Sequence, residues 1–298
     1  MARDVLKYDA QFGIGVETTP GAAATRTIFP ALTDLFGFKW DQKDQENNGL
    51  DQTTGQLVAH KGKGQGTDGY TARVIPTTIK AELDALIKRT DGQQSYLTLE
   101  AYDSVDAYAA AGCRCSELEM TFNDEMLTYT PKFIGMNVPA NGSKTAGTIS
   151  TLAAYGPDEL AFTIGAVTTY EVYGFKLGLN FGIEPKWAGL AKTTADGGPT
   201  ILRQGRPVVT LTADIGLGAS TLMDAYLAKT ELAFIMTATR GTAILTVTLP
   251  RIRIQSAEPK GDGDNMNISI EAKAYHDATE GVAKMLEIET DAESILTL

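Results

Sequence analysis

Three short segments carry residue types that nucleotide, metal or catalytic sites use. Gly62, Gly64 and Gly66 lie as close together as the glycines of loops that wrap phosphates. A phosphate loop needs a buried parallel strand before it and a helix directly after it. The next residues, 67–70 (TDGY), lead instead into another strand pattern. The glycines therefore predict a flexible arm or turn and not a nucleotide site.

Cys113 and Cys115 are the two cysteines of the chain and are separated by one residue. In a strand, this spacing places both sulfurs on one face. Zinc would need two more ligands, and the two histidines, His60 and His276, lie far away in the sequence. We expect a packed apolar face without a metal. Two cysteines also cannot build a disulfide framework, as is typical of a protein made in a reducing cytoplasm.

The remaining candidates point away from catalysis. Residues 262–265 (DGDN) look like the start of a calcium loop, but that loop needs Gly at its sixth position and Glu at its twelfth. Asn267 and Lys273 stand there, so we expect a polar turn between strands. The chain has no Gly-x-Ser-x-Gly element and only two histidines to act as bases. We predict no enzyme activity and no cofactor.

The composition fits a soluble, acidic, two-core protein. The chain has 298 residues, 43% of them hydrophobic, which suffices for two cores of about 100–150 residues each. Its net charge of −11 argues against a protein that neutralises nucleic-acid phosphates, and it would suit a surface that nucleic acid passes without binding. The start, MARDVLK, has no signal-peptide core, and no stretch reaches the ~20 apolar residues of a membrane span.

The dominant apolar period is two, which predicts half-buried strands in antiparallel sheets. Polar residues such as Thr98 and Glu100 alternate with the apolar ones and should face solvent. Pro250 interrupts a further strand pattern and predicts a bend or an edge position. The alternating apolar residues are Leu97, Leu99 and Ala101; Phe175, Leu177, Leu179 and Phe181; Val209, Leu211, Ala213 and Ile215; and Ile268, Ile270, Ala272 and Ala274.

Two amphipathic segments predict short helices. Residues 79–89 follow Thr78, and residues 221–229 follow Ser220; both residue types cap helix N-termini. We expect each helix to cover a sheet or a barrel end. The apolar stripes are Ile79, Leu83, Leu86 and Ile87 in the first helix and Leu222, Met223, Tyr226 and Leu227 in the second.

The helices belong to an internal repeat. The matching segments are GFK at 37–39 and 174–176, QG at 65–66 and 204–205, LDAL at 83–86 with MDAY at 223–226, and CRC at 113–115 with IRI at 252–254. Four matches in one order, at offsets of 137–140 residues, predict two similar domains of ordinary size. Isoleucines at the places of the cysteines also support an apolar, metal-free face.

Each repeat carries a segment without a regular apolar pattern, 41–51 in the first and 183–207 in the second. They predict two arms, 41–66 and 182–205, because such long loops in compact domains are usually functional or mobile. With a linker best placed at 137–147, we expect domains at 1–140 and 164–282, a connection at 141–163, and a tail at 283–298 that docks on a neighbour. The arm residues expected to make contacts are Asp41, Lys43, Asp44, Glu46, Lys61, Lys63, Glu184, Lys186, Trp187, Lys192 and Arg203.

The predicted fold is mainly β: two tandem, similar antiparallel β-barrel or sandwich domains, each with one short α-helix and a long arm. This organisation resembles the tail tube proteins of long-tailed, non-contractile bacteriophages, of the type with a duplicated tube domain. The resemblance rests on the GFK strand followed by an arm, on residues 204–212 (QGRPVVTLT), and on 241–254 (GTAILTVTLPRIRI), which is similar to the family's closing hairpin. It is best over 168–278, and the insertion at 103–111 departs from the family pattern.

The resemblance implies a structural virion protein that polymerises as stacked rings into the tail tube, the conduit for genome delivery. Three two-domain chains would close a pseudo-hexameric ring, with six chains as the alternative, and the arms would grip the next ring. Further implied partners are the tape-measure, tail terminator and distal tail proteins, while viral DNA would pass the lumen without specific binding. The tube would be assembled in the host bacterial cytoplasm, without a membrane, and located in the virion tail.

Two other classes remain open at this point. A non-enzymatic two-domain β-sandwich binding module, such as an adhesin or a virion decoration protein, would be a monomer with an aromatic-lined cleft. An enzyme would show a pocket with paired carboxylates or a histidine.

Overall fold

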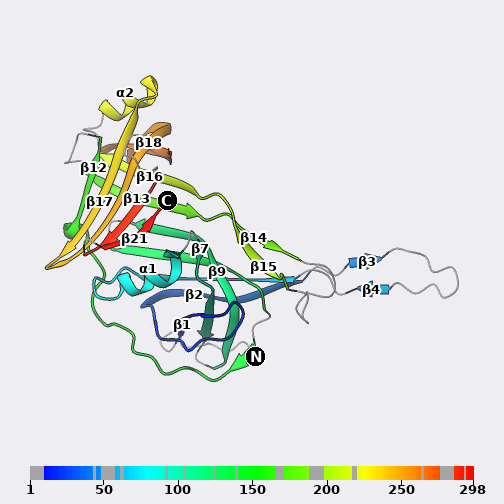
Figure 1. The fold of residues 1–298 in the computed structure, drawn as a ribbon. Helices are drawn as coiled ribbons and strands as arrows, with labels where there is room; N and C mark the ends of the chain where they lie inside the picture. The colour runs from blue at the N-terminus through cyan, green and yellow to red at the C-terminus, as the bar shows by residue number, and fades with distance from the viewer. Residues whose placement is uncertain are drawn as a thin grey trace.

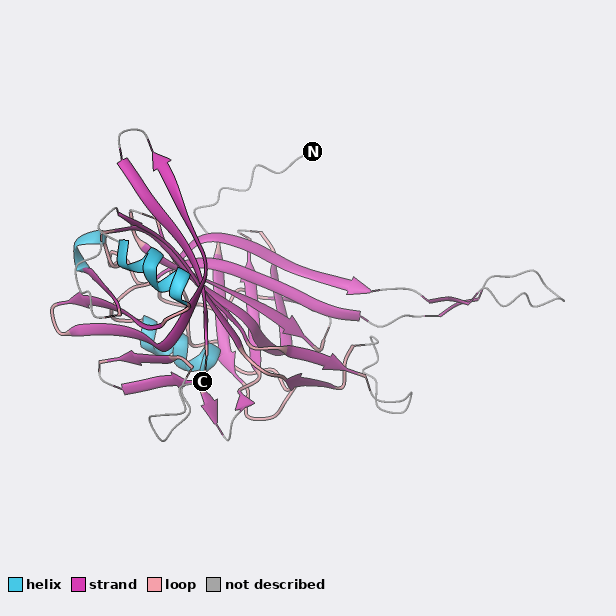
Figure 2. Ribbon diagram, turned by 90° about the horizontal axis from the view of Figure 1, so that it is seen from above, coloured by secondary structure: helices cyan, strands magenta, loops and turns pink. Residues whose placement is uncertain are grey.

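The computed structural model describes residues 10–42, 45–47, 58–60, 64–90, 93–103, 105–123, 125–137, 140–165, 171–187, 198–216, 220–262, 265–275, 285–291 and 293–298. The protein is mainly β, as predicted, and its ribbon shows long strands with the short α-helices at one end and extended arms at the other (Figures 1 and 2).

The elements of the first half of the chain are β1 (Gln11–Val16), β2 (Leu32–Gln42), β3 (Gln45–Asn47), β4 (Val58–His60), β5 (Gly64–Arg73), α1 (Ile79–Ile87), β6 (Arg89–Thr90), β7 (Gln93–Gln94), β8 (Leu97–Tyr102), β9 (Ala107–Phe122), β10 (Leu127–Gly135) and β11 (Ala140–Gly142). Those of the second half are the 3₁₀ helix η2 (Pro157–Glu159), β12 (Leu160–Ile164), β13 (Val172–Asn180), β14 (Ile183–Lys186), β15 (Ile201–Gln204), β16 (Val208–Gly216), α2 (Ser220–Ala228), β17 (Glu231–Arg240), β18 (Ala243–Asp262), β19 (Asn265–Ala274), β20 (Glu287–Thr290) and β21 (Glu293–Thr297).

A 15-stranded sheet runs through both halves, and every pairing between the described strands is antiparallel. In the first half the neighbours are β1-β8-β9-β10-β5-β2, and in the second half they are β12-β17-β18-β19-β16-β13. The chain therefore uses the same order of strands twice. β9 and β18 also receive one short extra strand each, β11 and β20.

The irregularities of the two ladders coincide as well. The β9–β10 register shifts between Lys132 and Phe133 and leaves out Ser116. The β18–β19 register shifts between Ile254 and Ser256 and leaves out Gln255, which lies 139 residues after Ser116. Bulges bend and twist strands locally, so bulges at matching places give the two halves the same curvature.

This ladder correspondence tests two of the sequence matches. Cys113 pairs with Gly135 and Ile252 pairs with Ala274, so the CRC and IRI segments occupy equivalent positions. The QG match is wrong, because Gln65 lies in β5 opposite Asp41 whereas the second glutamine, Gln204, ends β15.

The predicted apolar faces form the core. All the alternating apolar residues of β8, β13, β16 and β19 that the sequence singled out, with Phe181 just after β13, are buried. Two aromatic groups stand out within this core. Phe12, Tyr70, Tyr129 and Phe133 contact one another in the first half, and Phe122, Phe162, Phe175 and Phe234 form a chain of ring contacts where the halves meet.

The solvent-facing role predicted for Thr98 and Glu100 is wrong, since each is 1% exposed. Thr98 donates a hydrogen bond to Glu17 (2.8 Å), and Glu100 accepts one from Arg26 (2.8 Å) and one from the backbone N–H of Thr145 (2.7 Å). Segments before β2 and after β11 thus cover this face of β8, and the buried carboxylates are satisfied by these donors.

The helices form close to the predicted ranges, but α1 ends at Ile87, two residues early, and α2 runs from Ser220 to Ala228, so Ser220 lies inside it. The hydroxyl of Thr78 makes no capping hydrogen bond to α1. On α2, Leu222 is buried, but Leu227 is 70% exposed and does not join the apolar face that the pattern assigned to it. The corresponding α1 residue, Ile87, is fully buried.

The arms were expected to lack regular structure, and that expectation is wrong in part. β2 extends to Gln42, β3 pairs with β4, and β14 pairs with β15. Pairing between distant residues gives these segments their strand structure even though their sequences lack apolar alternation. At Pro250 the β17–β18 register shifts and leaves out Pro250 and Arg251, an irregularity of the kind that bends a strand, as predicted, and β18 continues beyond it.

The segments around the predicted domain boundaries are also structured. β11 lies in the segment expected to link the domains, and β12, which pairs with β17, spans the expected boundary at residue 163. The tail folds back on its own chain: β20 pairs with β18, β21 pairs with β20, and Lys80 of α1 forms an ion pair with Glu293.

Candidate assembly surfaces

The two halves are joined edge to edge between β9 and β13. Residues 117–122 of β9 pair with β10 on one side and with β13 on the other, with Leu118 opposite Leu179 and Phe122 opposite Phe175. Leu118 is fully buried and Leu179 is 2% exposed. The sheet therefore passes from one half to the other without an open edge, and the apolar face of both strands belongs to one core.

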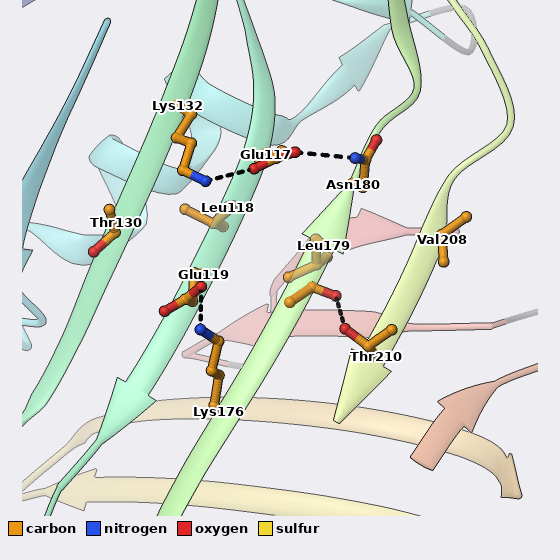
Figure 3. A pocket seen from close by; sticks show the side chains of 11 residues that line it. Glu117, Leu118, Glu119, Thr130, Lys132, Lys176, Leu179, Asn180, Val208 and Thr210 are labelled. Atoms are coloured by element: carbon orange, nitrogen blue, oxygen red, sulfur yellow. Dashed lines mark hydrogen bonds and ion pairs between the residues drawn. The ribbon is translucent and has the colours of Figure 1, made fainter. Parts of the chain in front are cut away.

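The opposite face of this joint is polar and carries paired charges (Figure 3). Lys132 of β10 forms an ion pair with Glu117 (2.8 Å), and Lys176 of β13 forms one with Glu119 (2.8 Å). Asn180 donates a hydrogen bond to Glu117 (3.1 Å). The bond to Glu117 raises the pKa of Lys132, so this lysine stays charged and paired at neutral pH.

Beyond β13, the second half packs into a hollow of the first half. Phe181 and Leu202 are fully buried there. The backbone N–H of Phe181 donates to the carbonyl oxygen of Ser116 (2.9 Å), and the guanidinium of Arg89 lies 5.9 Å from the centre of the Phe181 ring. Arg114 donates from Nη1 to the carbonyl oxygen of Leu202 (2.7 Å). The base of the β14–β15 arm is thus fixed to the first half.

Arg114 is the residue that sequence reasoning missed at this joint. It is 4% exposed, and its guanidinium lies 4.0 Å from the centre of the Tyr96 ring, in addition to its bond to Leu202. The signal was present in the repeat: Arg114 and Arg253 are the identical residues in the CRC and IRI segments.

The predicted arm residues fall into separate groups. In β14–β15, Glu184 lies opposite Arg203 and forms an ion pair with Lys186 (2.7 Å), and these cations hold the pKa of Glu184 below its usual value. Trp187 directly follows β14. In the other arm, Asp41 lies in β2, and Glu46 lies in β3, which is farther out along the projection than β14–β15 (Figure 1). Lys43, Asp44, Lys61, Lys63 and Lys192 lie outside the described residues.

The other candidate motifs have structural positions. Cys113 and Cys115 are buried and form no disulfide, and burial raises the pKa of the Cys115 thiol. Gly64 and Gly66 lie within β5, and Gly62 lies outside the described residues. Asp262 pairs with Asn265 at the end of the β18–β19 ladder. Among the described residues, no group of three His, Cys, Asp or Glu side chains could hold a metal ion. None of the helices described is long and apolar enough to cross a membrane.

The fold and these surfaces define a β-rich protein whose prominent features are sheet edges, arms and paired charges. A family model described as phage tail tube protein matches residues 8–274, and the chain belongs to this family. It is therefore a structural protein of a bacteriophage tail, in a family that self-assembles into the tail tube. The resemblance noted in the sequence is confirmed. A search of curated proteins found no sequence that matches the chain.

Proposed function

We propose that this chain forms rings of three copies, that the rings stack into the tail tube, and that the tube delivers the viral genome into the host. Each chain contributes two tube domains, near residues 1–140 and 164–282, with β12 attached to the second. The observation that carries the proposal is the shared strand order of the two halves together with their edge-to-edge joint at β9–β13. A ring that repeats this joint covers the edges that the strands at the joint would otherwise leave open, and covered edges are stable.

Three chains with two domains each give a ring with threefold symmetry and six similar positions. The halves differ in detail, for example Cys113 against Ile252, so sixfold symmetry would be approximate only. A ring of six chains is the alternative stoichiometry.

In the tube, the arms contact the next ring. The β3–β4 hairpin supports this role, because it projects far from the core and has only its own strands as partners among the described elements (Figure 2). The ends of the tube would be completed by tail terminator and distal tail proteins, and assembly would take place around a tape-measure protein in the host cytoplasm.

Viral DNA passes the lumen without specific binding in this proposal, and the protein acts as a conduit and not as an enzyme. The net charge of −11 supports this, since a negative wall repels phosphates. The ion pairs of Lys132 and Lys176 support it further, because lysines held by glutamates offer phosphates little attraction.

Negative-stain electron microscopy of concentrated, purified protein, alone and with its tail partners, tests self-assembly. We expect rings or tubes, and cryo-electron microscopy should then resolve three chains per ring and two superposable domains per chain. A monomer under all these conditions would instead favour the binding-module class. Six chains per ring would contradict the trimer.

A further inference from the structure

We propose that residues 256–262 of β18 and the pocket beside α2 bind β2 and the base of its arm from a neighbouring chain. The contact would repeat, between chains, the joint that β9 and β13 make within the chain. This inference rests on the proposed ring assembly and adds the surfaces, the register and the residues of the contact.

The edge of β18 is open where the edge of β9 is covered. Residues 256–262 of β18 pair with β19 alone among the described strands, whereas the matching residues of β9, 117–123, meet both β10 and β13 over most of their length. Burial differs accordingly: Met120 is fully buried, while Pro259, its counterpart 139 residues later, is exposed. An unpaired edge of this length is a template for another strand.

β2 is the strand that fits this edge. It ends the order of the sheet, with β5 as its neighbour, and β13 holds the same place in the second half. Within the chain, β13 occupies the edge of β9. Among the described strands, β2 is then the terminal strand that still lacks a partner of this kind, and residues 256–262 of β18 are the matching edge that is still open. In a ring these two meet, which identifies a second copy of this chain as the partner.

The ladders give the register of the contact. Within the chain, Gly178 of β13 lies opposite Glu119. Gly178 also pairs with Thr210, and Thr210 pairs with Lys273. The matching path in the first half runs from Lys39 to Thr67 and on to Ile134, which lies 139 residues before Lys273. By this path through β5 and β10, Lys39 is the counterpart of Gly178, whereas the bulges that leave out Phe36 of β2 and Tyr173 of β13 lie 137 residues apart, as the GFK motifs do.

The counterpart of Glu119 is Glu258, since both positions follow the same bulge in β9 and β18. The register thus places Lys39 of one chain opposite the exposed Glu258 of its neighbour. Opposite charges at facing positions of an antiparallel pair are favourable. Alignment by the GFK motif would instead place Lys39 opposite Lys260, two like charges, so the ladder register is also the better one electrostatically.

The pocket beside α2 is the second part of the contact. It is lined by Tyr226, Leu227, Lys229, Arg253, Ile254, Gln255 and Tyr275. The matching hollow of the first half includes Arg89, Arg114 and Ser116, and there Phe181 and Leu202 fill it. Leu227 is 70% exposed, whereas its counterpart Ile87 is fully buried. The pocket beside α2 is therefore the equivalent of the hollow that holds the base of the β14–β15 arm. It is open because no arm base from the same chain fills it.

Proline at position 259 removes one backbone donor from this edge, which weakens the ladder without preventing it. The chain already contains a precedent, because Pro131 of β10 pairs with Leu118 of β9, and the pairing of β10 with β5 stops at Tyr129 and resumes at Lys132. The contact should accordingly rely on the flanking pairs and on the pocket.

Disulfide trapping tests the register. Hydrogen-bonded and non-hydrogen-bonded pairs alternate along an antiparallel ladder. Phe181 donates to Ser116 in the β9–β13 ladder, so Gly178 and Glu119, three residues farther along each strand, form a non-hydrogen-bonded pair, whose Cα atoms are about 4.5 Å apart. The equivalent Lys39→Cys and Glu258→Cys pair suits a disulfide. In oxidised tubes of the double variant, we expect covalently linked oligomers of the protein on non-reducing gels. The single variants and the slipped pair Lys39→Cys with Lys260→Cys should give few or none.

Leu227→Glu tests the pocket independently of any cross-link. The variant should keep the circular dichroism of the wild-type monomer, because the side chain is exposed, and lose most ring formation in sedimentation. Leu152→Glu, at a position 51% exposed outside the pocket, is the matched control and should assemble normally.

The outcomes separate this inference from the function on which it rests. If wild-type protein forms tubes but the Lys39 and Glu258 positions do not cross-link, or Leu227→Glu assembles fully, the contact is overturned and the tube function stands. If wild-type protein never assembles, the proposed function falls, and the contact falls with it.

Discussion

Lys176 on β13 lies 2.8 Å from Glu119 on β9, so an ion pair joins the two halves of the chain across their shared ladder. Both side chains are partly exposed, 54% and 35%. Exposed pairs contribute only about 0–1 kcal/mol, because water screens them and ordering two side chains costs entropy. The apolar contacts on the other face must therefore provide most of the stability of the joint.

Alanine substitutions on the two faces should separate these contributions. Leu118→Ala removes a fully buried side chain from the core and should lower the free energy of unfolding by about 2–5 kcal/mol. Lys176→Ala should lower it by less than about 1 kcal/mol. Urea denaturation of the unassembled chain measures both. Equal losses would show that the ion pair is not the minor contribution.

Glu82 predicts a specific pH dependence. It is 1% exposed, accepts a hydrogen bond from the hydroxyl of Tyr129, and burial raises its pKa. The folded chain then holds the Glu82 proton more tightly than the unfolded chain does. Its contribution to stability is complete below the unfolded pKa near 4.5 and decreases as pH rises through the raised folded value.

Glu82→Gln should remove this part of the pH dependence while keeping an oxygen that can accept from Tyr129. Relative to wild type, the variant should gain stability as the pH is raised from 4 to 8 in thermal or urea unfolding. Glu117→Gln, a change at an exposed carboxylate, is the control and should not show that gain. Parallel curves for wild type and Glu82→Gln would contradict the prediction.

The sequence predicted the strands of the core well, because a strand with one buried face must alternate. It also revealed the repeat, but it placed parts of it incorrectly. The GFK motifs suggest an offset of 137, which the bulges at Phe36 and Tyr173 share, whereas the path through β5 and β10 makes Lys39 the counterpart of Gly178. Short matches on strands can slip by two residues because such a slip preserves the face on which every side chain lies.

Contacts between segments that lie far apart in the sequence could not be predicted from local patterns. Thr98 and Glu100 look solvent-facing by alternation, yet segments far away in the sequence bury them. The same holds for the hollow that receives Phe181 and Leu202, since a pocket depends on which distant strand lies beside it. Composition also failed for the β14–β15 arm, where strand structure comes from pairing and not from an apolar period.

The buried cysteines should not react with thiol reagents in the folded chain. Cys113 is 3% exposed and Cys115 is fully buried, and burial raises the pKa of the Cys115 thiol, which disfavours the reactive thiolate. We expect a thiol reagent at pH 8 to modify neither residue in native protein and both in denaturant. Rapid modification of native protein would show that β9 opens, and would require cysteine-free variants for disulfide trapping.

The arm between β2 and β5 should be dispensable for folding and necessary for stacking. Gln42 lies directly opposite Gly64 in the ladder, so residues 43–63 can be replaced by an Asn-Gly turn that closes the two strands as a tight hairpin. The core pairs of β2 and β5 are untouched, and the melting temperature should stay within a few degrees of wild type. Because the arm would contact the next ring, electron microscopy should show rings but no long tubes. A second variant, with a Gly/Ser segment of the same length in place of 43–63, separates reach from contact: it should also fail to stack if the native side chains make the contact. Tubes with normal ring spacing in both variants would show that this arm does not join the rings.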